Sequence, residues 1–258
     1  MLGLAVGLIA GMLGIGGGTT LVPILVFLFN AQEFNSARIL HLAIATTIAT
    51  IIFTSVSSVW QHHRRSVVRW DIVKKTMGGL IIGTIVGTFV AEILNTKSLA
   101  IFFVLFVYFS SYQLFFDSKS SFKRSLPGYF GISIAAFVIG IVSSLVGAGG
   151  GVISIPLMVL CRIPIIQAVG TSAALGFPIA LTGSIGYIYH GFGKSLLPEL
   201  SIGYVYLPAL FGIVIGTFIT VPYGVRLAHK VSGNTLKKIF SVILFMLATR
   251  MLWKFFSI

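Results

Sequence analysis

Long apolar runs alternate with short polar segments along the whole chain. Eight such runs can be traced, at residues 2–29, 39–60, 77–94, 98–116, 128–160, 165–190, 204–223 and 236–253. A helix needs about 20 mostly apolar residues to cross a bilayer, and these runs approach or exceed that length. The pattern therefore predicts an all-α, polytopic membrane protein that forms a single membrane domain over residues 1–258.

Two of the runs are interrupted by glycine clusters of the same form. Residues 14–18 read GIGGG and residues 147–151 read GAGGG, and each cluster is followed five residues later by a proline, Pro23 or Pro156. Each glycine costs a helix about 1 kcal/mol relative to alanine. Unwound backbone in hydrocarbon is tolerated only where protein or a water-filled cavity surrounds it. A duplicated break of this kind predicts the binding site of a transporter built from two repeats; the alternative is close helix packing through small residues.

The glycine clusters head two halves that repeat one order of four elements. The second element begins with AIATT at residues 43–47 and with AVGTS at 168–172, and the third contains GTF at 87–89 and again at 216–218. We expect a first repeat at residues 1–117, a basic linker at 118–127 and a second repeat at 128–258. Within the third element of the first half, Gly79, Gly83 and Gly87 recur every four residues. Their spacing predicts a smooth stripe for tight helix packing.

The distribution of basic residues bears on how the two halves are oriented. If each broken element crosses the membrane, the halves are parallel and one side receives 11 of the 18 Lys and Arg residues. If each broken element enters and returns on the same side, the halves are inverted and one side receives 13 of the 18. The most basic segment between runs, residues 61–75, lies on that richer side in both cases. The positive-inside rule favours the inverted arrangement and leaves the parallel one open.

Composition agrees with a membrane location. The chain is 57% hydrophobic and only 9% charged, with a net charge of +13, whereas soluble domains carry about 25% charged residues. The basic residues lie mostly in short segments between apolar runs, so we expect a lipid bilayer, not nucleic acid, as the partner. The single cysteine, Cys161, excludes an intramolecular disulfide. Met1 opens directly into an apolar run without a basic segment, so we expect no cleaved signal peptide.

The glycine clusters and the hydroxyl residues beside them form the candidate site. A helix start offers unpaired backbone N–H groups and a partial positive charge, and therefore binds anions without a formal cation. We predict that the two breaks meet near the midplane and bind a small anion. The substrate-binding candidates are Gly16, Gly17, Gly18, Thr19, Thr20, Thr46, Thr47, Gly149, Gly150, Gly151, Ser154, Thr171 and Ser172. The alternative for each hydroxyl is a hydrogen bond to the carbonyl one helical turn earlier.

Charged candidates are few. Arg38 and Arg162 each lie between a broken element and the next span, where a basic side chain either reaches the membrane interface or attracts an anion. Glu92 is the acid deepest in an apolar run, and we favour an interfacial residue over a proton-coupling one. The five histidines lack metal-ligand spacing with acids or cysteines: His41, His62, His63, His190 and His229. No nucleophile–base pair, phosphate loop or dinucleotide fingerprint is present, so we expect no metal, no cofactor and no enzymatic activity.

Together these motifs resemble the TauE/SafE sulfite exporter family of membrane permeases. The resemblance is carried by the glycine cluster of each half, by the AIATT and AVGTS sequences, and by the segment WQHHRRSVVRW at residues 60–70. It implies transport of small sulfur-containing or organic anions such as sulfite, thiosulfate or a sulfonate, by alternating access, in the cytoplasmic (inner) membrane of a bacterium. A homodimer is a further expectation. A channel-like pore for the same anions and a non-transporting membrane subunit are the alternatives.

Overall fold

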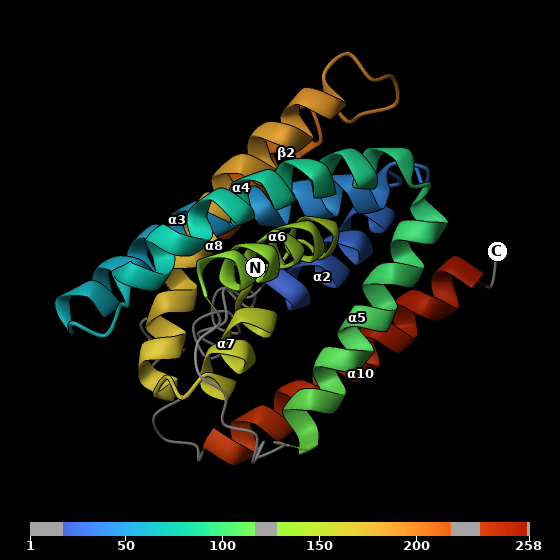
Figure 1. Cartoon of the computed structure of the whole chain (residues 1–258). Helices are drawn as coiled ribbons and strands as arrows, with labels where there is room; N and C mark the ends of the chain where they lie inside the picture. The colour runs from blue at the N-terminus through green and yellow to red at the C-terminus, as the bar shows by residue number, and fades with distance from the viewer. Residues whose placement is uncertain (1–17, 117–127, 218–232, 257–258) are drawn as a thin grey trace.

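The computed structural model describes residues 18–116, 128–217 and 233–256 (Figure 1). Almost all of them are helical, and the only strands in these ranges form a two-residue hairpin, β1 (Ser201–Ile202) with β2 (Val205–Tyr206). The helices are α2 (Gly18–Ala31), α3 (Ile39–Arg64), α4 (Trp70–Ile93), α5 (Thr96–Phe116), α6 (Tyr129–Val146), α7 (Gly151–Leu160), α8 (Ile165–Gly191), an unlabelled helix at Leu207–Thr217, and α10 (Gly233–Phe256). The predicted all-α fold is confirmed, while the predicted linker at 118–127 lies outside the described residues.

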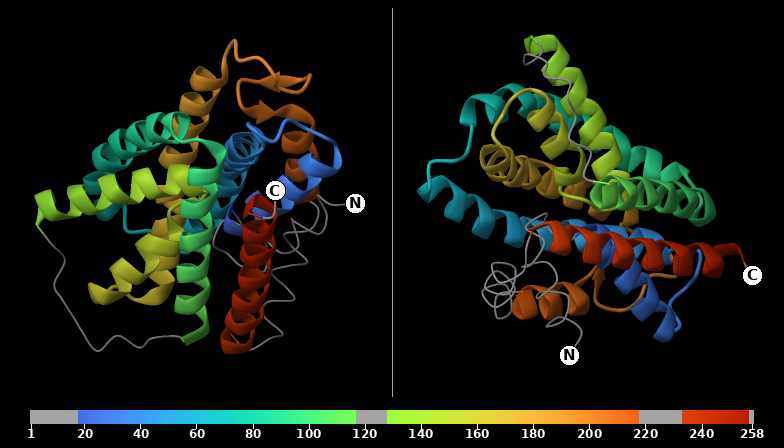
Figure 2. Two further views of the ribbon diagram at one scale, coloured as in Figure 1. Left: turned by 90° about the vertical axis from the view of Figure 1, so that its right-hand side faces the viewer. Right: turned by 90° about the horizontal axis from the view of Figure 1, so that it is seen from below.

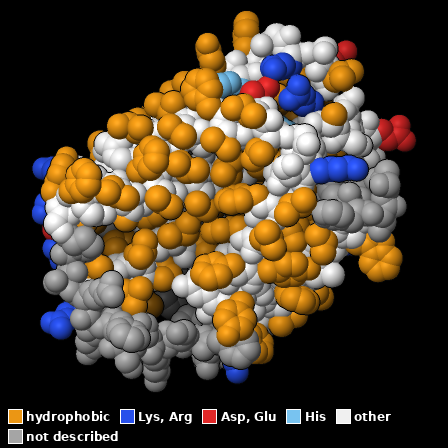
Figure 3. Space-filling view, turned by 45° about the vertical axis from the view of Figure 1, so that its right-hand side comes forward, with side chains coloured by type: hydrophobic (Ala, Val, Ile, Leu, Met, Phe, Trp, Pro, Cys, Tyr) orange, Lys and Arg blue, Asp and Glu red, His pale blue; other side chains and the backbone are white. Residues whose placement is uncertain are grey.

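In the part of the chain that the structure describes, four helices are long and apolar enough to cross a membrane: α3, α4, α6 and α8. On the face shown in Figure 3, apolar side chains cover a broad area, and charged side chains lie near its edges. This distribution is the one that a bilayer requires, because charged groups at its centre are costly. The protein is an integral membrane protein.

Two of the predicted boundaries were wrong. The segment 61–75 was expected to be a loop, but α3 continues to Arg64 and α4 begins at Trp70, so Lys74 and Lys75 lie on a helix. Helix α4 can start there because Asp71 places a negative charge in its first turn. The run 204–223 was expected to be one span, but its first residues belong to the β-hairpin and the helix begins at Leu207.

The glycine stripe of α4 packs against α6. A Cβ atom added at Gly83 would overlap the carbonyl oxygen of Phe137, and one added at Gly87 would overlap the hydroxyl of Ser144. From α6, Gly140 approaches the backbone of α4 at Leu80 in the same way. The two helices run parallel, because higher residue numbers in α4 meet higher numbers in α6. The predicted packing role of the stripe is confirmed.

The elements that the sequence matched between halves pair antiparallel. In α3 and α8, His62 packs on Gly170, Ser55 on Gly176 and Ile48 on Gly183. In α5 and α10, which lie side by side in Figures 1 and 2, the Ser111 hydroxyl donates to the Ser241 carbonyl oxygen at 2.9 Å. A two-fold axis in the membrane plane relates each helix of one half to an antiparallel helix of the other half. The two-repeat organisation remains a prediction, and this pairing favours its inverted form.

Replacing Gly83 with alanine should destabilise the protein by about 1–3 kcal/mol, because the new methyl group would overlap the backbone of α6. The matched control is Gly78→Ala, since an added Cβ at Gly78 meets nothing within 4 Å. That control should be neutral or stabilising by up to about 1 kcal/mol, through helix propensity alone. Thermal unfolding of the purified protein in detergent measures both. Equal melting temperatures for the two variants would contradict the close contact between α4 and α6.

Candidate anion site

The second glycine cluster is a real interruption of the helix. α6 ends at Val146 and α7 begins at Gly151, with Gly147 at φ 69° and Gly150 at φ 77°. Both angles lie in the left-handed region, which side chains other than glycine rarely adopt. Gly147 caps α6 by donating its N–H to the Ser143 carbonyl oxygen. The break predicted at residues 147–151 is therefore confirmed.

The broken element enters and returns on the same side. α6 begins beside the start of α4, where the Ser133 hydroxyl lies 3.5 Å from the Lys75 carbonyl oxygen, and runs parallel to α4. α7 then runs antiparallel to α8, because Gly149 packs on Gly176 and Ser154 bonds to Ser172. The short turn after α7 therefore leads back to the end where α6 started. A long arm of 18 residues and a short arm of 10 form this hairpin.

The tip of the hairpin lies at mid-height of the two central helices. A Cβ added at Gly149 would lie 3.4 Å from Ile51 Cγ2 and 3.8 Å from Gly176 Cα. Ile51 is near the middle of the 26-residue α3, and Gly176 is near the middle of the 27-residue α8. The break is thus held at the centre of the pair of helices that spans the membrane.

The last residue of the first glycine cluster, Gly18, lies at this tip. A Cβ added at Gly18 would overlap the Gly147 carbonyl oxygen and lie 3.1 Å from Ala148 Cα. Gly151 is the first residue of α7, and Gly18 is the first residue of α2 that the structure describes, so both helices have these residues beside one break. Thr19 and Thr20 are buried in the first turn of α2. Gly16 and Gly17 lie outside the described residues.

Two buried hydroxyls beside the break have no hydrogen-bond partner among the described residues. Thr47 Oγ1 belongs to a side chain that is 0% exposed, and Ser143 Oγ to one that is 1% exposed. Thr47 shares its face of α3 with Ile44 and Ile51, which contact Gly147 and Gly149. Ser143 Oγ lies 3.5 Å from the position of a Cβ added at Gly150. A buried hydroxyl without a partner is costly, so these two groups are available to a solute.

The equivalent hydroxyl of the second half is already paired. The Ser154 hydroxyl donates to Ser172 Oγ at 2.9 Å. In the first half the residue aligned with Ser154 by the glycine clusters is Leu21, which offers Thr47 no hydroxyl. In the predicted repeat, Leu21 at the position of Ser154 accounts for this difference between Thr47 and Ser172.

Thr46 and Thr171 have a role that the sequence did not predict. The backbone N–H of Arg69 donates to Thr171 Oγ1 at 3.0 Å, and that of Tyr206 donates to Thr46 Oγ1 at 3.1 Å. Arg69 precedes α4, and Tyr206 precedes the helix Leu207–Thr217. Each threonine thus accepts a bond at a helix start in the opposite half. Sequence reasoning also missed Ser143, although a serine four residues before the first glycine of the break is visible in the sequence.

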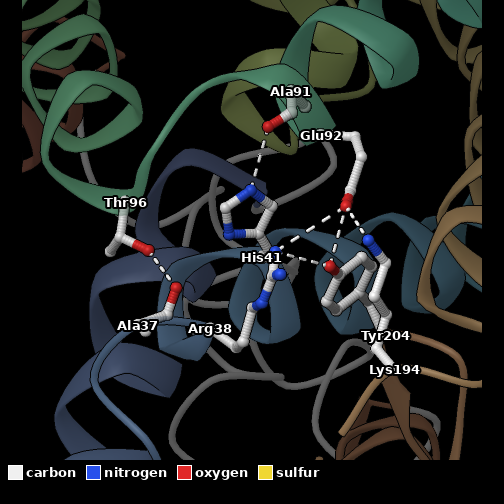
Figure 4. A network of polar contacts seen from close by, with 8 residues as sticks. All are labelled: Ala37, Arg38, His41, Ala91, Glu92, Thr96, Lys194 and Tyr204. Atoms are coloured by element: carbon white, nitrogen blue, oxygen red, sulfur yellow. Dashed lines mark hydrogen bonds and ion pairs between the residues drawn. The ribbon is translucent and has the colours of Figure 1, made fainter.

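A charged cluster lies at one end of the central pair of helices (Figure 4). Glu92 accepts hydrogen bonds from Lys194 Nζ at 2.7 Å and from the Tyr204 hydroxyl at 2.9 Å, and Arg38 Nη1 lies 3.7 Å from it. Arg38 also donates to the Tyr204 hydroxyl at 2.9 Å. Burial and the neighbouring carboxylate raise the pKa of Tyr204, which therefore keeps its proton. We call Arg38, Glu92, Lys194 and Tyr204 the Glu92 cluster.

The two arginines proposed as electrostatic candidates are placed differently. Arg38 is engaged by the Glu92 cluster. Arg162 is exposed in the turn between α7 and α8, at φ 64°. Neither arginine contacts the break in the structure, and among the described residues no group of three His, Cys, Asp or Glu side chains could hold a metal ion.

A re-entrant broken helix buried against long apolar spans is the architecture of a membrane transporter. Comparison with known proteins identifies the family to which the chain belongs. The family model described as sulfite exporter TauE/SafE matches residues 1–251, so the chain belongs to this family of membrane transporters.

Several relatives cover nearly the whole chain. A probable membrane transporter protein of Haemophilus influenzae is 32% identical over 98% of this chain and 97% of its own length. The probable membrane transporter protein YunE of Bacillus subtilis is 26% identical over 98% of this chain and 96% of its own length. A probable membrane transporter protein of Methanocaldococcus jannaschii is 24% identical over 95% of this chain and 90% of its own length. No solved structure matches the chain.

Replacing Glu92 with glutamine should lower stability by about 1–3 kcal/mol, because the substitution leaves two cations without their common counter-charge in a partly buried place. The matched control is Asp71→Asn, which breaks the exposed pair with Arg69 and should cost less than about 1 kcal/mol. Thermal unfolding at low salt measures the difference. If both variants lose the same stability, the pairing of Glu92 with Arg38 and Lys194 does not stabilise the protein more than an exposed ion pair does.

Proposed function

We propose that the protein transports a small sulfur-containing or organic oxyanion, bound between the two glycine clusters. The observation that carries the proposal is the meeting of Gly18 with Gly147 at mid-height of α3 and α8. Two helix starts and the unpartnered hydroxyls of Thr47 and Ser143 lie beside that meeting point. The family and the names of the relatives support transport.

The chemistry of the site suits an anion that must leave again. Amide N–H groups at the start of α7, such as those of Gly151 and Val152, have no acceptor within their own helix. Glycine lets an oxyanion approach the backbone closely, and hydroxyls add donors that carry no net charge. Several weak donors bind an ion with moderate affinity, which permits release.

The two ends of the α3–α8 pair offer a mechanism for alternating access. At one end Thr171 bonds to the start of α4, next to the exposed Arg69–Asp71 pair. At the other end Thr46 bonds to Tyr206, near the Glu92 cluster. We propose that these contacts open in turn, while the break at the centre remains the common binding point.

We propose export as the direction of transport and the bacterial cytoplasmic membrane as its location. An inside-negative potential favours anion export by about 2.3 kcal/mol per charge per 100 mV, so export of sulfite or a sulfonate needs no coupling ion. We place the protein in the cytoplasmic membrane of a bacterium, as a multi-pass protein that forms a homodimer. Export by a transporter is distinguished from a channel-like pore by a flux that saturates with substrate.

Replacing Thr47 with valine should weaken anion binding roughly tenfold or more, because a hydrogen bond to a charged group contributes about 1.5–3 kcal/mol. The substitution keeps the shape of the side chain and removes a buried hydroxyl without a partner. Stability should therefore be unchanged or higher. Titration calorimetry with sulfite and with methanesulfonate measures affinity, and thermal unfolding measures stability.

The matched control is Thr50→Val, one turn further along α3. The Thr50 hydroxyl already donates to the Thr46 carbonyl oxygen at 2.9 Å, so its removal should leave anion affinity unchanged. Equal affinities for wild type and Thr47→Val would remove Thr47 from the site. Failure of every small oxyanion to bind the wild-type protein would favour a non-transporting subunit whose glycines serve packing alone.

A further inference from the structure

The helices around the break carry no charged side chain near it. No Asp, Glu, Lys or Arg occurs in residues 1–32, 39–63, 125–161 or 163–193, which include α2, α6, α7, α8 and all of α3 except Arg64. In α4, the interval between Lys75 and Glu92 is also free of charge. The side chains that contact the second cluster are Val22, Ile44, Ile51, Ile139, Ser143 and Ile179. Among the described residues, the helices that line the break therefore present no formal cation to an anion bound there.

Within the helices that line the break in the described residues, positive charge comes from the helix starts alone. A helix start is equivalent to about half an elementary charge. Gly151 begins α7 at the break, and Gly18, the first described residue of α2, lies against the same break, so helix starts there compensate at most about one negative charge. A second negative charge would remain uncompensated in a buried place, which costs several kcal/mol.

From this balance we infer that the site accepts an anion in its singly charged form and excludes doubly charged oxyanions. A weak-acid oxyanion such as sulfite is then bound as hydrogen sulfite, with its proton. The inference rests on the proposed function and specifies the charge of its substrate. Transport of such an anion also moves one proton, without a titrating side chain at the break.

The unpartnered hydroxyls fit a protonated oxyanion better than a basic side chain would. A hydroxyl both donates and accepts, whereas the side chains of Lys and Arg only donate. Thr47 Oγ1 or Ser143 Oγ can therefore donate to one oxygen of the anion or accept from its O–H group. Both hydroxyls lie on faces that meet the break and have no partner among the described residues.

Titratable groups of the protein lie toward the ends of the lining helices. On α3 these are His41, whose Nε2 lies 2.9 Å from the Ala91 carbonyl oxygen, and His62 and His63 in its last turn. On α8 they are Tyr189, His190, whose ring packs on Phe89, and Tyr187, whose hydroxyl donates to the Ser144 carbonyl oxygen. On α4 they are Asp71, Lys74 and Lys75 near its start and, near its end, Glu92, which is paired with Lys194 and Arg38. α2, α6 and α7 contain no Asp, Glu, Lys, Arg or His. The affinity for a probe anion of constant charge would change with pH only if one of these protein groups affected binding, so such a probe is the control for their titration.

The experiment compares three probes on the purified full-length protein between about pH 6 and about pH 9. Methanesulfonate is singly charged throughout and has nearly the shape of sulfate, with a methyl group in place of one oxygen; it shares the three sulfur-bound oxygens of sulfite. Sulfate is doubly charged throughout, and sulfite changes from one charge to two near neutrality. Affinity is measured by titration calorimetry, with ligand-induced thermal stabilisation as a second readout.

We expect the affinity for methanesulfonate to be constant across this range. The affinity for total sulfite should fall about tenfold per pH unit once the pH exceeds its second pKa, because only the protonated fraction binds. Sulfate should bind at least about 100-fold more weakly than methanesulfonate, the ratio that corresponds to about 2.7 kcal/mol. Thr47→Val should weaken methanesulfonate and hydrogen sulfite by the same factor.

Two outcomes would overturn the inference while leaving the proposed function intact. One is an affinity for sulfite that stays constant or rises with pH while that for methanesulfonate is constant. The other is binding of sulfate as tight as that of methanesulfonate. Failure of all three probes to bind would instead overturn the proposed function, and this inference with it.

Discussion

Backbone that is unwound deep in a hydrocarbon layer must be enclosed by protein, because lipid offers its polar groups no hydrogen bonds. The interruption at residues 147–151 meets this constraint through its neighbours. α3 and α8 lie against it with Ile51 and Gly176, and the start of α2 lies against it with Gly18. Gly18 lies too close to the Gly147 carbonyl oxygen for a side chain at that position. A Cβ at Gly149 would instead meet Ile51 and Gly176 at ordinary contact distances. The arrangement of the central helices follows from the need to enclose this one interruption.

Polarity is distributed in three layers along the central helices. The middle has helix starts and hydroxyls but no charge, while one end has the Glu92 cluster and the other has the Arg69–Asp71 pair. Charges at the ends are solvated or paired, so they cost little. A charge in the middle would bind an anion tightly and slow its release. The neutral middle therefore suits a protein that moves an ion instead of retaining it.

Much of the fold could be predicted from the sequence, because its signals are local. The apolar runs predicted the spans, the stripe at Gly79, Gly83 and Gly87 predicted the contact with α6, and the cluster at 147–151 predicted the break. The roles of Thr46 and Thr171 could not be predicted, because their partners at Tyr206 and Arg69 are distant in sequence.

The candidate site was predicted in outline, and its details depended on packing. The sequence identified Thr47 and Ser172 as equivalents, but only the structure shows one unpartnered and the other bonded to Ser154. Ser143 was missed because a serine within an apolar helix most often bonds to its own backbone. The start of α4 was also missed, since charged residues at 69–75 resemble a loop until Asp71 is seen within the first turn of the helix.

Two hydrogen bonds link segments that are far apart in the sequence, one between Thr46 and Tyr206 and one between Thr171 and Arg69. They affect the order in which the chain can fold as it is synthesised. The amide before α4 is made early, yet its acceptor on α8 is made about 100 residues later, at an interval that translation covers in several seconds or more. Until then the first half lacks the contact that holds the start of α4. The bond at the start of α4 can therefore form only after α8 has been synthesised.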